Sequence, residues 1–236
     1  MNSNSRIFYA PDIDSVPELP EDESQHCTRI LRLKKGDAIT IIDGKGFFYS
    51  AVIVDIHFKH CLVSVTKRWM QKINRDYTIH IAVAATKNVN RMEWLVEKAT
   101  EIGIDTITCL RCNHSERNEI KLQRLYKTAI SAIKQSQKAI LPQINEMTDF
   151  YEFISTYQKG SKMIAHCAAD RKQFIKEVYT PHNDALVLIG PEGDFSRNEI
   201  NAALSAGFVP VSLGDSRLRT ETAALTACLT IHLLNQ

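Results

Sequence analysis

No apolar run in this sequence approaches the roughly 18 to 20 residues that a helix needs to span a bilayer. The segment 1–6 also lacks the apolar core of a secretion signal. We therefore expect a cytoplasmic protein without membrane contact. The composition, 44% hydrophobic and 24% charged over 236 residues, is that of a folded globular protein. It excludes disordered and collagen-like classes and allows one large domain or two smaller ones.

The sequence also lacks the common phosphate-binding motifs. It contains neither G-x-x-x-x-G-K-S/T nor a G-x-G-x-x-G followed by an acidic residue at ribose distance. The formal net charge of +2 does not by itself indicate nucleic-acid binding. Basic residues do gather in segments 67–91 and 111–127, and acidic residues gather in 18–23. The basic clusters are either phosphate contacts or solvated faces.

The sequence has six cysteines, and their spacing argues against a metal or redox centre. Cys109 and Cys112 have C-x-x-C spacing, but no second pair and no paired histidine follows. We expect a buried strand cysteine followed by a loop cysteine, reduced thiols throughout, and no metal.

The first part of the chain, residues 7–67, has the pattern of a β-rich domain. Apolar segments 38–42 and 49–54 flank Asp43-Gly44-Lys45-Gly46, a strong hairpin signal. Segment 61–65 reads as a further strand, and 26–33 as a short helix. These elements predict a compact β-barrel domain over residues 1–72, too small to be an enzyme alone.

After a polar, basic segment at 68–76, strands alternate with helices. This alternation predicts an α/β domain over residues 73–236, with a mostly parallel sheet and helices on both faces. Gly103 is placed to end one helix, and Ser196 with Glu199 forms a capping box at the start of another. The expected strands are 77–84, 104–110, 162–166, 185–189 and 208–213, and the expected helices are 92–102, 121–138, 171–178, 197–206 and 221–234.

Two glycine-containing segments, 189–196 and 213–223, each follow an expected strand and lead into an expected helix. Such turns hold small molecules at the carboxyl ends of strands in α/β folds. Glu192 and Asp194 would repel a phosphate there. A ligand with a positive centre, or with adenine and ribose donors, fits these segments better.

These segments resemble the cofactor-binding signature of the ribosomal RNA small subunit methyltransferase E family, of the SPOUT class. The matching residues are Gly190-Pro191-Glu192-Gly193-x-Phe195-Ser196 and Leu213-Gly214-x-x-x-Leu218-Arg219-x-Glu221-Thr222-Ala223. Segments 87–103 and 135–142 resemble its first helix and middle motif, and 26–37 resembles its PUA-like N-terminal domain. The likeness therefore covers nearly the whole chain. Asp194, Lys134, Lys138 and the order Asp215-Ser216-Arg217 depart from the usual family residues.

The resemblance implies a deep trefoil knot in the C-terminal domain, a homodimer joined through the knot helices, and S-adenosylmethionine as cofactor. The two glycine loops would then follow neighbouring strands. The apolar face of the last helix, with Leu225, Cys228, Leu229 and Leu233, suits a dimer interface or a buried core. The implied cofactor-binding residues are His166, Ile189, Gly190, Pro191, Glu192, Gly193, Leu213, Gly214, Leu218, Thr222 and Ala223.

The implied reaction is methylation of N3 of a specific uracil in 16S rRNA, within the small ribosomal subunit. Arg219 would stabilise the uracil anion or contact phosphate, although an inter-subunit ion pair is the alternative. Glu221 would orient a group or accept the proton, unless it is only a helix N-terminal carboxylate. His166 is a pocket wall or a satisfied core residue. The implied RNA contacts, each alternatively a plain surface charge, are Arg6, Arg29, Arg32, Lys34, Lys35, Lys87 and Arg91.

Two other functions remain open from the sequence. One is a SPOUT methyltransferase that acts on another RNA, such as tRNA. The other is a non-catalytic RNA-binding protein that has kept the fold, which would predict a blocked pocket. The intact Gly190, Gly193 and Gly214 argue against the second.

Overall fold

The computed structural model describes residues 6–72, 75–156, 160–168 and 173–236. The chain divides into two compact units. The first comprises Met1–Ile73 with Ile130–Leu141, and the second comprises Asn74–Ala129 with Pro142–Gln236. The predicted division at residue 72 differs from this one, because it places residues 130–141 in the second domain. No helix within the described residues is both long and apolar enough to cross a membrane.

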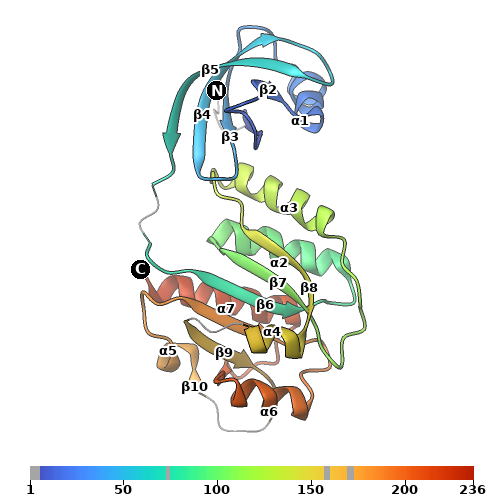
Figure 1. Cartoon of the computed structure of the whole chain (residues 1–236), viewed down its shortest axis with the longest axis vertical. Helices are drawn as coiled ribbons and strands as arrows, with labels where there is room; N and C mark the ends of the chain where they lie inside the picture. The colour runs from blue at the N-terminus through green and yellow to red at the C-terminus, as the bar shows by residue number, and fades with distance from the viewer. Residues whose placement is uncertain (1–5, 73–74, 157–159, 169–172) are drawn as a thin grey trace. The chain divides into compact units, whose positions relative to one another are not determined.

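The first unit contains a five-stranded sheet in the order β1-β3-β4-β5-β2 (Figure 1). The expected hairpin is confirmed, because β3 pairs antiparallel with β4 around residues 43–46. β5 extends well beyond the expected segment 61–65 and into the segment 68–76, for which the sequence shows only a polar, basic pattern. They continue as strand because they stay paired with the start of β4. The strands are β1 (Ile7–Tyr9), β2 (Glu18–Leu19), β3 (Ala38–Ile42), β4 (Phe47–Asp55) and β5 (Cys61–Met70).

The short helix of this unit begins earlier than expected and changes type. It is an α-helix at α1 (Glu21–Gln25) that continues as a π-helix at η2 (His26–Ile30). Acidic residues occupy the first turn of α1, where the helix dipole favours negative charge. Ser24 fixes the helix to the sheet, because its Oγ donates to Leu19 O at 2.9 Å and accepts from Cys61 N at 2.9 Å.

The end of α3 (Leu122–Gln135) belongs to the first unit for clear physical reasons. Lys134 Nζ lies 2.7 Å from Glu23 Oε1 in a largely buried ion pair. Ile133 and Ala139 pack in the apolar cluster that includes Ile42. The departure from the family pattern at Lys134 therefore has a structural role here.

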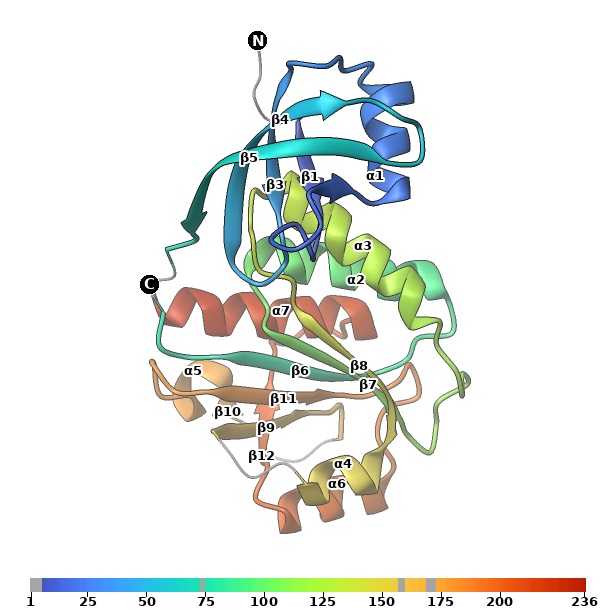
Figure 2. The same ribbon diagram turned by 45° about the horizontal axis from the view of Figure 1, so that its top comes forward.

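The second unit is a seven-stranded sheet in the order β10-β12-β9-β11-β6-β7-β8. Every strand pair is parallel, as expected from the strand and helix alternation. α2 and α7 lie on one face, and α4 and α6 on the other (Figures 1 and 2). The strands are β6 (Ile79–Ala84), β7 (Thr106–Arg111), β8 (Gln143–Asp149), β9 (Ser161–Ala165), β10 (Gln173–Phe174), β11 (Ala185–Ile189) and β12 (Val209–Ser212). The helices are α2 (Val89–Ile102), α4 (Phe150–Thr156), α5 (Ile175–Val178), α6 (Arg197–Ser205) and α7 (Thr220–Leu234).

Several sequence expectations for this unit need correction. β8 and α4 were not expected, and β8 lacks a strand signal because its only apolar residues are Ile144 and Met147. The expected helix 171–178 begins outside the described residues and is then a short strand followed by α5. The glycine loops do not follow neighbouring strands, because β9 lies between β11 and β12.

The helix ends and the C-x-x-C cysteines of this unit lie where the sequence predicted them. α2 ends at Gly103, and the capping box at the start of α6 is formed. Cys109 lies buried in β7, and Cys112 follows in a loop. Burial raises the pKa of the Cys109 thiol to about 12, which keeps it protonated and unreactive.

Candidate functional site

Two cavities lie over the carboxyl ends of the adjacent strands β12, β9 and β11. The larger has a volume of about 630 Å³ and the smaller about 340 Å³. Ala165, Cys167, Asp194, Leu218 and Ala223 line both, so the two cavities are contiguous. A site at this edge of a parallel sheet is where α/β folds hold ligands.

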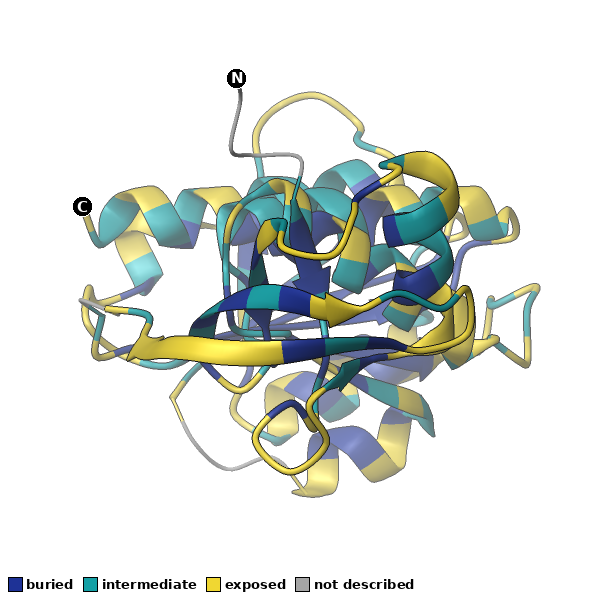
Figure 3. Cartoon of the chain, turned by 90° about the horizontal axis from the view of Figure 1, so that it is seen from above, coloured by how far each residue is buried: buried dark blue, intermediate teal, exposed yellow. Residues whose placement is uncertain are grey.

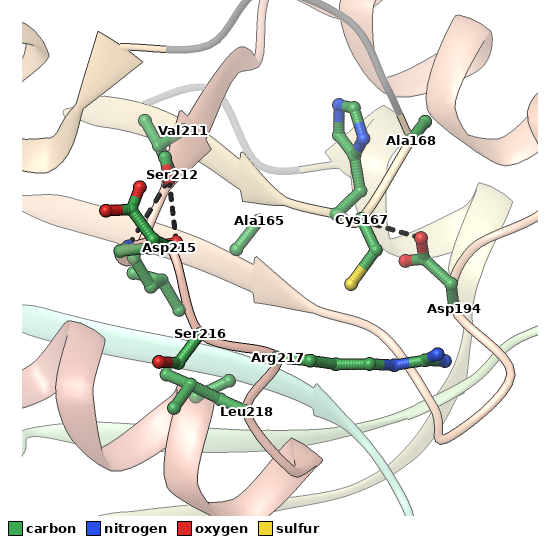
Figure 4. A pocket seen from close by; sticks show the side chains of 14 residues that line it. Ala165, Cys167, Ala168, Asp194, Val211, Ser212, Asp215, Ser216, Arg217 and Leu218 are labelled. Atoms are coloured by element: carbon green, nitrogen blue, oxygen red, sulfur yellow. Dashed lines mark hydrogen bonds between the residues drawn. The ribbon is translucent and has the colours of Figure 1, made fainter.

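The larger cavity is formed by the loops after β9 and β12. The side chains of Cys167 and Arg217 both reach into it (Figure 4). Asp194 and Asp215 bring negative charge to its wall, and Arg217 brings positive charge. The predicted cofactor-binding residues among its lining are His166, Leu213, Gly214, Leu218 and Ala223.

The smaller cavity is lined by the loop after β11 and by the residues that lead into α7. It carries three guanidinium groups, from Arg91, Arg217 and Arg219. α7 begins here with Arg219 as its N-cap residue, which makes no side-chain capping hydrogen bond. The predicted cofactor-binding residues among its lining are Ile189, Gly190, Pro191, Glu192, Leu218 and Ala223.

Asp194 ties together the loops after β9 and β11. Its carboxylate accepts a hydrogen bond from the amide of Cys167 at 2.7 Å and from its own neighbour Phe195 at 2.8 Å. Its φ of 66° lies in the left-handed region, where glycine, asparagine and aspartate are best tolerated. This left-handed position therefore accommodates an aspartate, whose side chain then anchors the loop.

Arg91 forms an ion-pair cluster at the rim of the smaller cavity. Its Nη1 lies 3.7 Å from Glu192 Oε1, and its Nε lies 3.6 Å from Glu221 Oε1. The other oxygen of Glu221, Oε2, is buried without a hydrogen-bond partner among the described residues. Glu221 does not line either of these two cavities and contacts the site through Arg91. Thr220 adds a further link, because its Oγ1 donates to Gly190 O at 3.0 Å.

Two predicted cofactor-binding residues, Gly193 and Thr222, line neither of these cavities. Gly193 faces a different loop, since a Cβ added there would come within 3.2 Å of His114 Cβ. Gly190 is also tightly packed, because an added Cβ would approach the ring of Phe195 at 3.1 Å. These glycines shape the loop after β11 through close packing.

The predicted RNA-contacting residues are divided between the two units. Lys87 lies 2.7 Å from Glu116, and Arg6 lies 3.7 Å from Asp37. Arg91 belongs to the cavity rim. Arg29 and Arg32, with Lys34 and Lys35, lie in or just after η2 of the first unit.

Sequence reasoning missed several residues that line the cavities. Cys167 directly follows the predicted site residue His166, so the end of β9 was the available signal. Asp215, Ser216 and Arg217 also line the larger cavity, and in the sequence they are marked only by their departure from the family pattern. The other lining residues not predicted are Ala165, Ala168, Val211, Ser212 and Thr220, with Asp194.

Comparison with known proteins agrees with this architecture. Residues 73–232 match the family described as RNA methyltransferase domain, and residues 19–66 match the RNA methyltransferase PUA domain. The crystal structure of a probable rRNA-methyltransferase from Porphyromonas gingivalis is 45% identical, covers 98% of each chain and has a TM-score of 0.93.

Two further relatives carry a common name, ribosomal RNA small subunit methyltransferase E. The Neisseria gonorrhoeae protein, solved bound to S-adenosyl methionine, is 25% identical over 98% of each chain, with a TM-score of 0.87. The Buchnera aphidicola protein is 27% identical over 97% of this chain and 93% of its own.

The fold and the cavities define a two-unit α/β protein with a ligand-sized site over the ends of its parallel strands. The matched domains and relatives identify it further. The chain belongs to the RNA methyltransferase family, and within it to the group of ribosomal RNA small subunit methyltransferase E.

Proposed function

We propose that this protein transfers the methyl group of S-adenosylmethionine to N3 of a specific uracil in 16S rRNA, in the cytoplasm. The observation that carries the proposal is the pair of contiguous cavities, because two carboxylates and one guanidinium line the larger, whereas three guanidinium groups and two carboxylates line the smaller. The larger would hold the cofactor and the smaller the target base. The relative from Neisseria gonorrhoeae, solved with S-adenosyl methionine, supports this molecule as the cofactor.

The residues of the larger cavity fit that cofactor, which supplies a methyl group on a positively charged sulfur. Asp194 and Asp215 suit the positive charge. Gly214 lines the cavity, and a Cβ added there would meet no atom within 4 Å. Its backbone is therefore open to close approach by a ligand. A loop around Gly214 that was buried, apolar or blocked by other side chains would have contradicted cofactor binding in the larger cavity.

The smaller cavity suits a uracil that loses its N3 proton. The negative charge that develops on O2 or O4 needs donors already in place. We assign this role to Arg219, with help from the first-turn amides of α7, where the helix dipole is positive. Holding base and methyl donor in line can lower the barrier by about 7–11 kcal/mol, so positioning outweighs acid-base help.

We assign Glu221 an orienting role. It contacts the site through Arg91, which Glu192 holds from the other side. Two carboxylates that contact the same guanidinium hold it in place more firmly than a single carboxylate does. Arg91 thus serves the cavity, and its assignment as an RNA-backbone contact is replaced by this proposal.

We further propose that the first unit binds the rRNA backbone through Arg29, Arg32, Lys34 and Lys35, with Arg6 and Lys87 as additional contacts. The matched PUA domain over residues 19–66 supports RNA binding by this unit. The substrate would be 16S rRNA within the small ribosomal subunit, as the name shared by the relatives suggests.

The trefoil knot and the homodimer also remain proposals. α7 supports a dimer, because Leu229 and Leu233 are 41% and 57% exposed while Cys228, expected on the same apolar face, is buried in the core. Exposed leucines on a helix whose other side is fully packed suit an interface between two copies. Leu229→Glu with Leu233→Glu would then give a monomer in sedimentation, whereas an unchanged mass would exclude this face.

Calorimetry tests the enzymatic assignment. Micromolar binding of S-adenosylmethionine supports it, and no binding at millimolar cofactor would instead favour a non-catalytic RNA-binding protein. Methylation of tRNA with 16S rRNA left unmodified would favour the alternative substrate.

A further inference from the structure

The start of β4 and the end of β5 form a two-stranded extension of the sheet in the first unit. We call this extension the aromatic ribbon. It consists of residues 47–50 and 67–70, paired antiparallel in register. From Ser64 to Met70, β5 is exposed on both faces, as the continuous yellow part of this strand shows in Figure 3. Within the described residues, this stretch of β5 pairs only with β4, so its outer edge is open.

Trp69 is the central side chain of the ribbon, and its ring is held in place. It lies opposite Phe48, and the two rings are stacked with centres 5.5 Å apart and planes at 8°. Phe48 in turn packs against the buried cluster that includes Ile42 and Ile133. The indole is nevertheless 37% exposed. A flat ring covered on one face and fixed by packing loses little freedom when a second ring stacks on it.

One cation lies beside this ring, and a second lies on the opposite face of the ribbon. Lys67 Nζ lies 5.7 Å from the centre of the Trp69 ring. The Arg68 guanidinium lies 3.8 Å from the ring centre of Phe47 and pairs with Asp14 at 3.2 Å. Exposed Met70 adds apolar surface at the end of the strand. The ribbon therefore combines a stacking surface with cations, only one of which has a carboxylate partner within 4.0 Å among the described residues.

We infer that Trp69 is a stacking site for an unpaired base of single-stranded RNA, with Lys67 as the contact for an adjoining phosphate. Fixed aromatic rings beside cations are the combination that binds single-stranded nucleic acid, because every base has a π-face and every linkage carries charge. The inference rests on the proposed function and adds a base contact to it, outside the cavities and outside the basic residues 29–35.

The two tryptophans of the chain make a direct test possible. Trp94, on α2, is 41% exposed and has no assigned role. Trp94→Phe in the full-length protein leaves Trp69 as the sole tryptophan and the sole indole reporter. We expect a short uridine-rich single-stranded RNA to quench the emission of Trp69, and an abasic backbone of the same length to bind without that quenching. Unchanged emission at saturating RNA would overturn the inference.

Substitution supplies the second measurement. Trp69→Ala should weaken RNA binding about five- to a hundredfold, the range for loss of one base stack, whereas Trp69→Phe should retain most of the affinity. Trp94→Phe is the matched control with unchanged affinity. Lys67→Ala should lower the slope of log affinity against log salt by about 0.7. Equal RNA affinity of Trp69→Ala and the unmodified protein would contradict the stacking site.

Methyl transfer measured on the same proteins separates this inference from the proposed function. A protein that methylates 16S rRNA but shows no quenching and no effect of Trp69→Ala would refute only the stacking site. A protein that shows quenching without methyl transfer under any condition would refute only the enzymatic assignment.

Discussion

The carboxylate of Asp194 accepts a hydrogen bond from the backbone amide of Cys167 at 2.7 Å and so joins two loops that wall both cavities. This single side chain provides an anchor between the loops and a negative charge at the site. Two substitutions separate these contributions. Asn keeps an acceptor oxygen and tolerates the positive φ, whereas Gly keeps only the backbone conformation.

Asp194→Asn should weaken binding of S-adenosylmethionine about tenfold, equal to about 1.4 kcal/mol, and leave S-adenosylhomocysteine nearly unaffected. The difference arises because only the first ligand carries a sulfonium charge. Asp194→Gly should weaken both, since the loop anchor is lost. Calorimetry with the two ligands measures this. An equal loss for both ligands in the Asn variant would show that the charge plays no part.

Gly214→Ala tests the close approach of the cofactor to the loop after β12. Gly214 has a φ of +125°, and Gly36 in the first unit has a φ of +92°. An added Cβ meets no atom within 4 Å at either position, so backbone strain, about 1–3 kcal/mol, is the cost common to both. We expect both variants to lower the melting temperature and only Gly214→Ala to lower cofactor affinity. A similar loss of affinity in Gly36→Ala would mean that strain alone explains it.

A double-mutant cycle tests the orienting role of Glu221. Arg91→Lys and Glu221→Gln should each lower the rate of methyl transfer about ten- to a hundredfold, because either change loosens the same guanidinium. The double variant should lose little more than either single variant. Rate measurements at saturating cofactor provide the comparison. Additive losses would instead assign Glu221 an independent role, such as proton acceptor.

His80 predicts a dependence of stability on pH. It is buried in β6, with its Nε2 2.8 Å from Thr108 Oγ1, and burial lowers its pKa from 6.5 to about 4. The neutral ring is therefore favoured in the folded protein. The stabilisation is complete above pH 6.5 and declines by about 3 kcal/mol as the pH falls to 4, because the unfolded chain then binds the proton.

Denaturant unfolding of the unmodified protein and of His80→Gln, measured over this pH range, provides the check. Glutamine does not titrate, so the variant should show a flatter dependence. Parallel curves for the two proteins would assign the acid sensitivity to other groups.

The sequence predicted most of the second unit because its apolar strands and helix boundaries are strong local signals. Gly103 and the pair Ser196 with Glu199 mark helix ends through backbone geometry, which depends little on the rest of the fold. The sequence does not reveal β8, because this edge strand has only two apolar residues and no alternation of polar and apolar positions. The placement of β9 between β11 and β12 depends on how the chain crosses over the sheet, which no local pattern encodes.

Local sequence motifs also predicted part of the candidate site. Gly214 and Leu218 belong to motifs that are contiguous in sequence, and both line the larger cavity. The bond from Asp194 to Cys167 and the contact between Arg91 and Glu221 join distant segments. Such contacts depend on strand order, so sequence spacing alone does not reveal them.

We propose that this protein methylates N3 of a uracil in 16S rRNA. The most direct measurement is nucleoside mass spectrometry of 16S rRNA from a strain lacking the enzyme, before and after incubation of its small subunits with the protein and S-adenosylmethionine. We predict that 3-methyluridine is absent before incubation and present afterwards. The absence of 3-methyluridine after incubation, or a methyl group on a different base, would contradict the proposal.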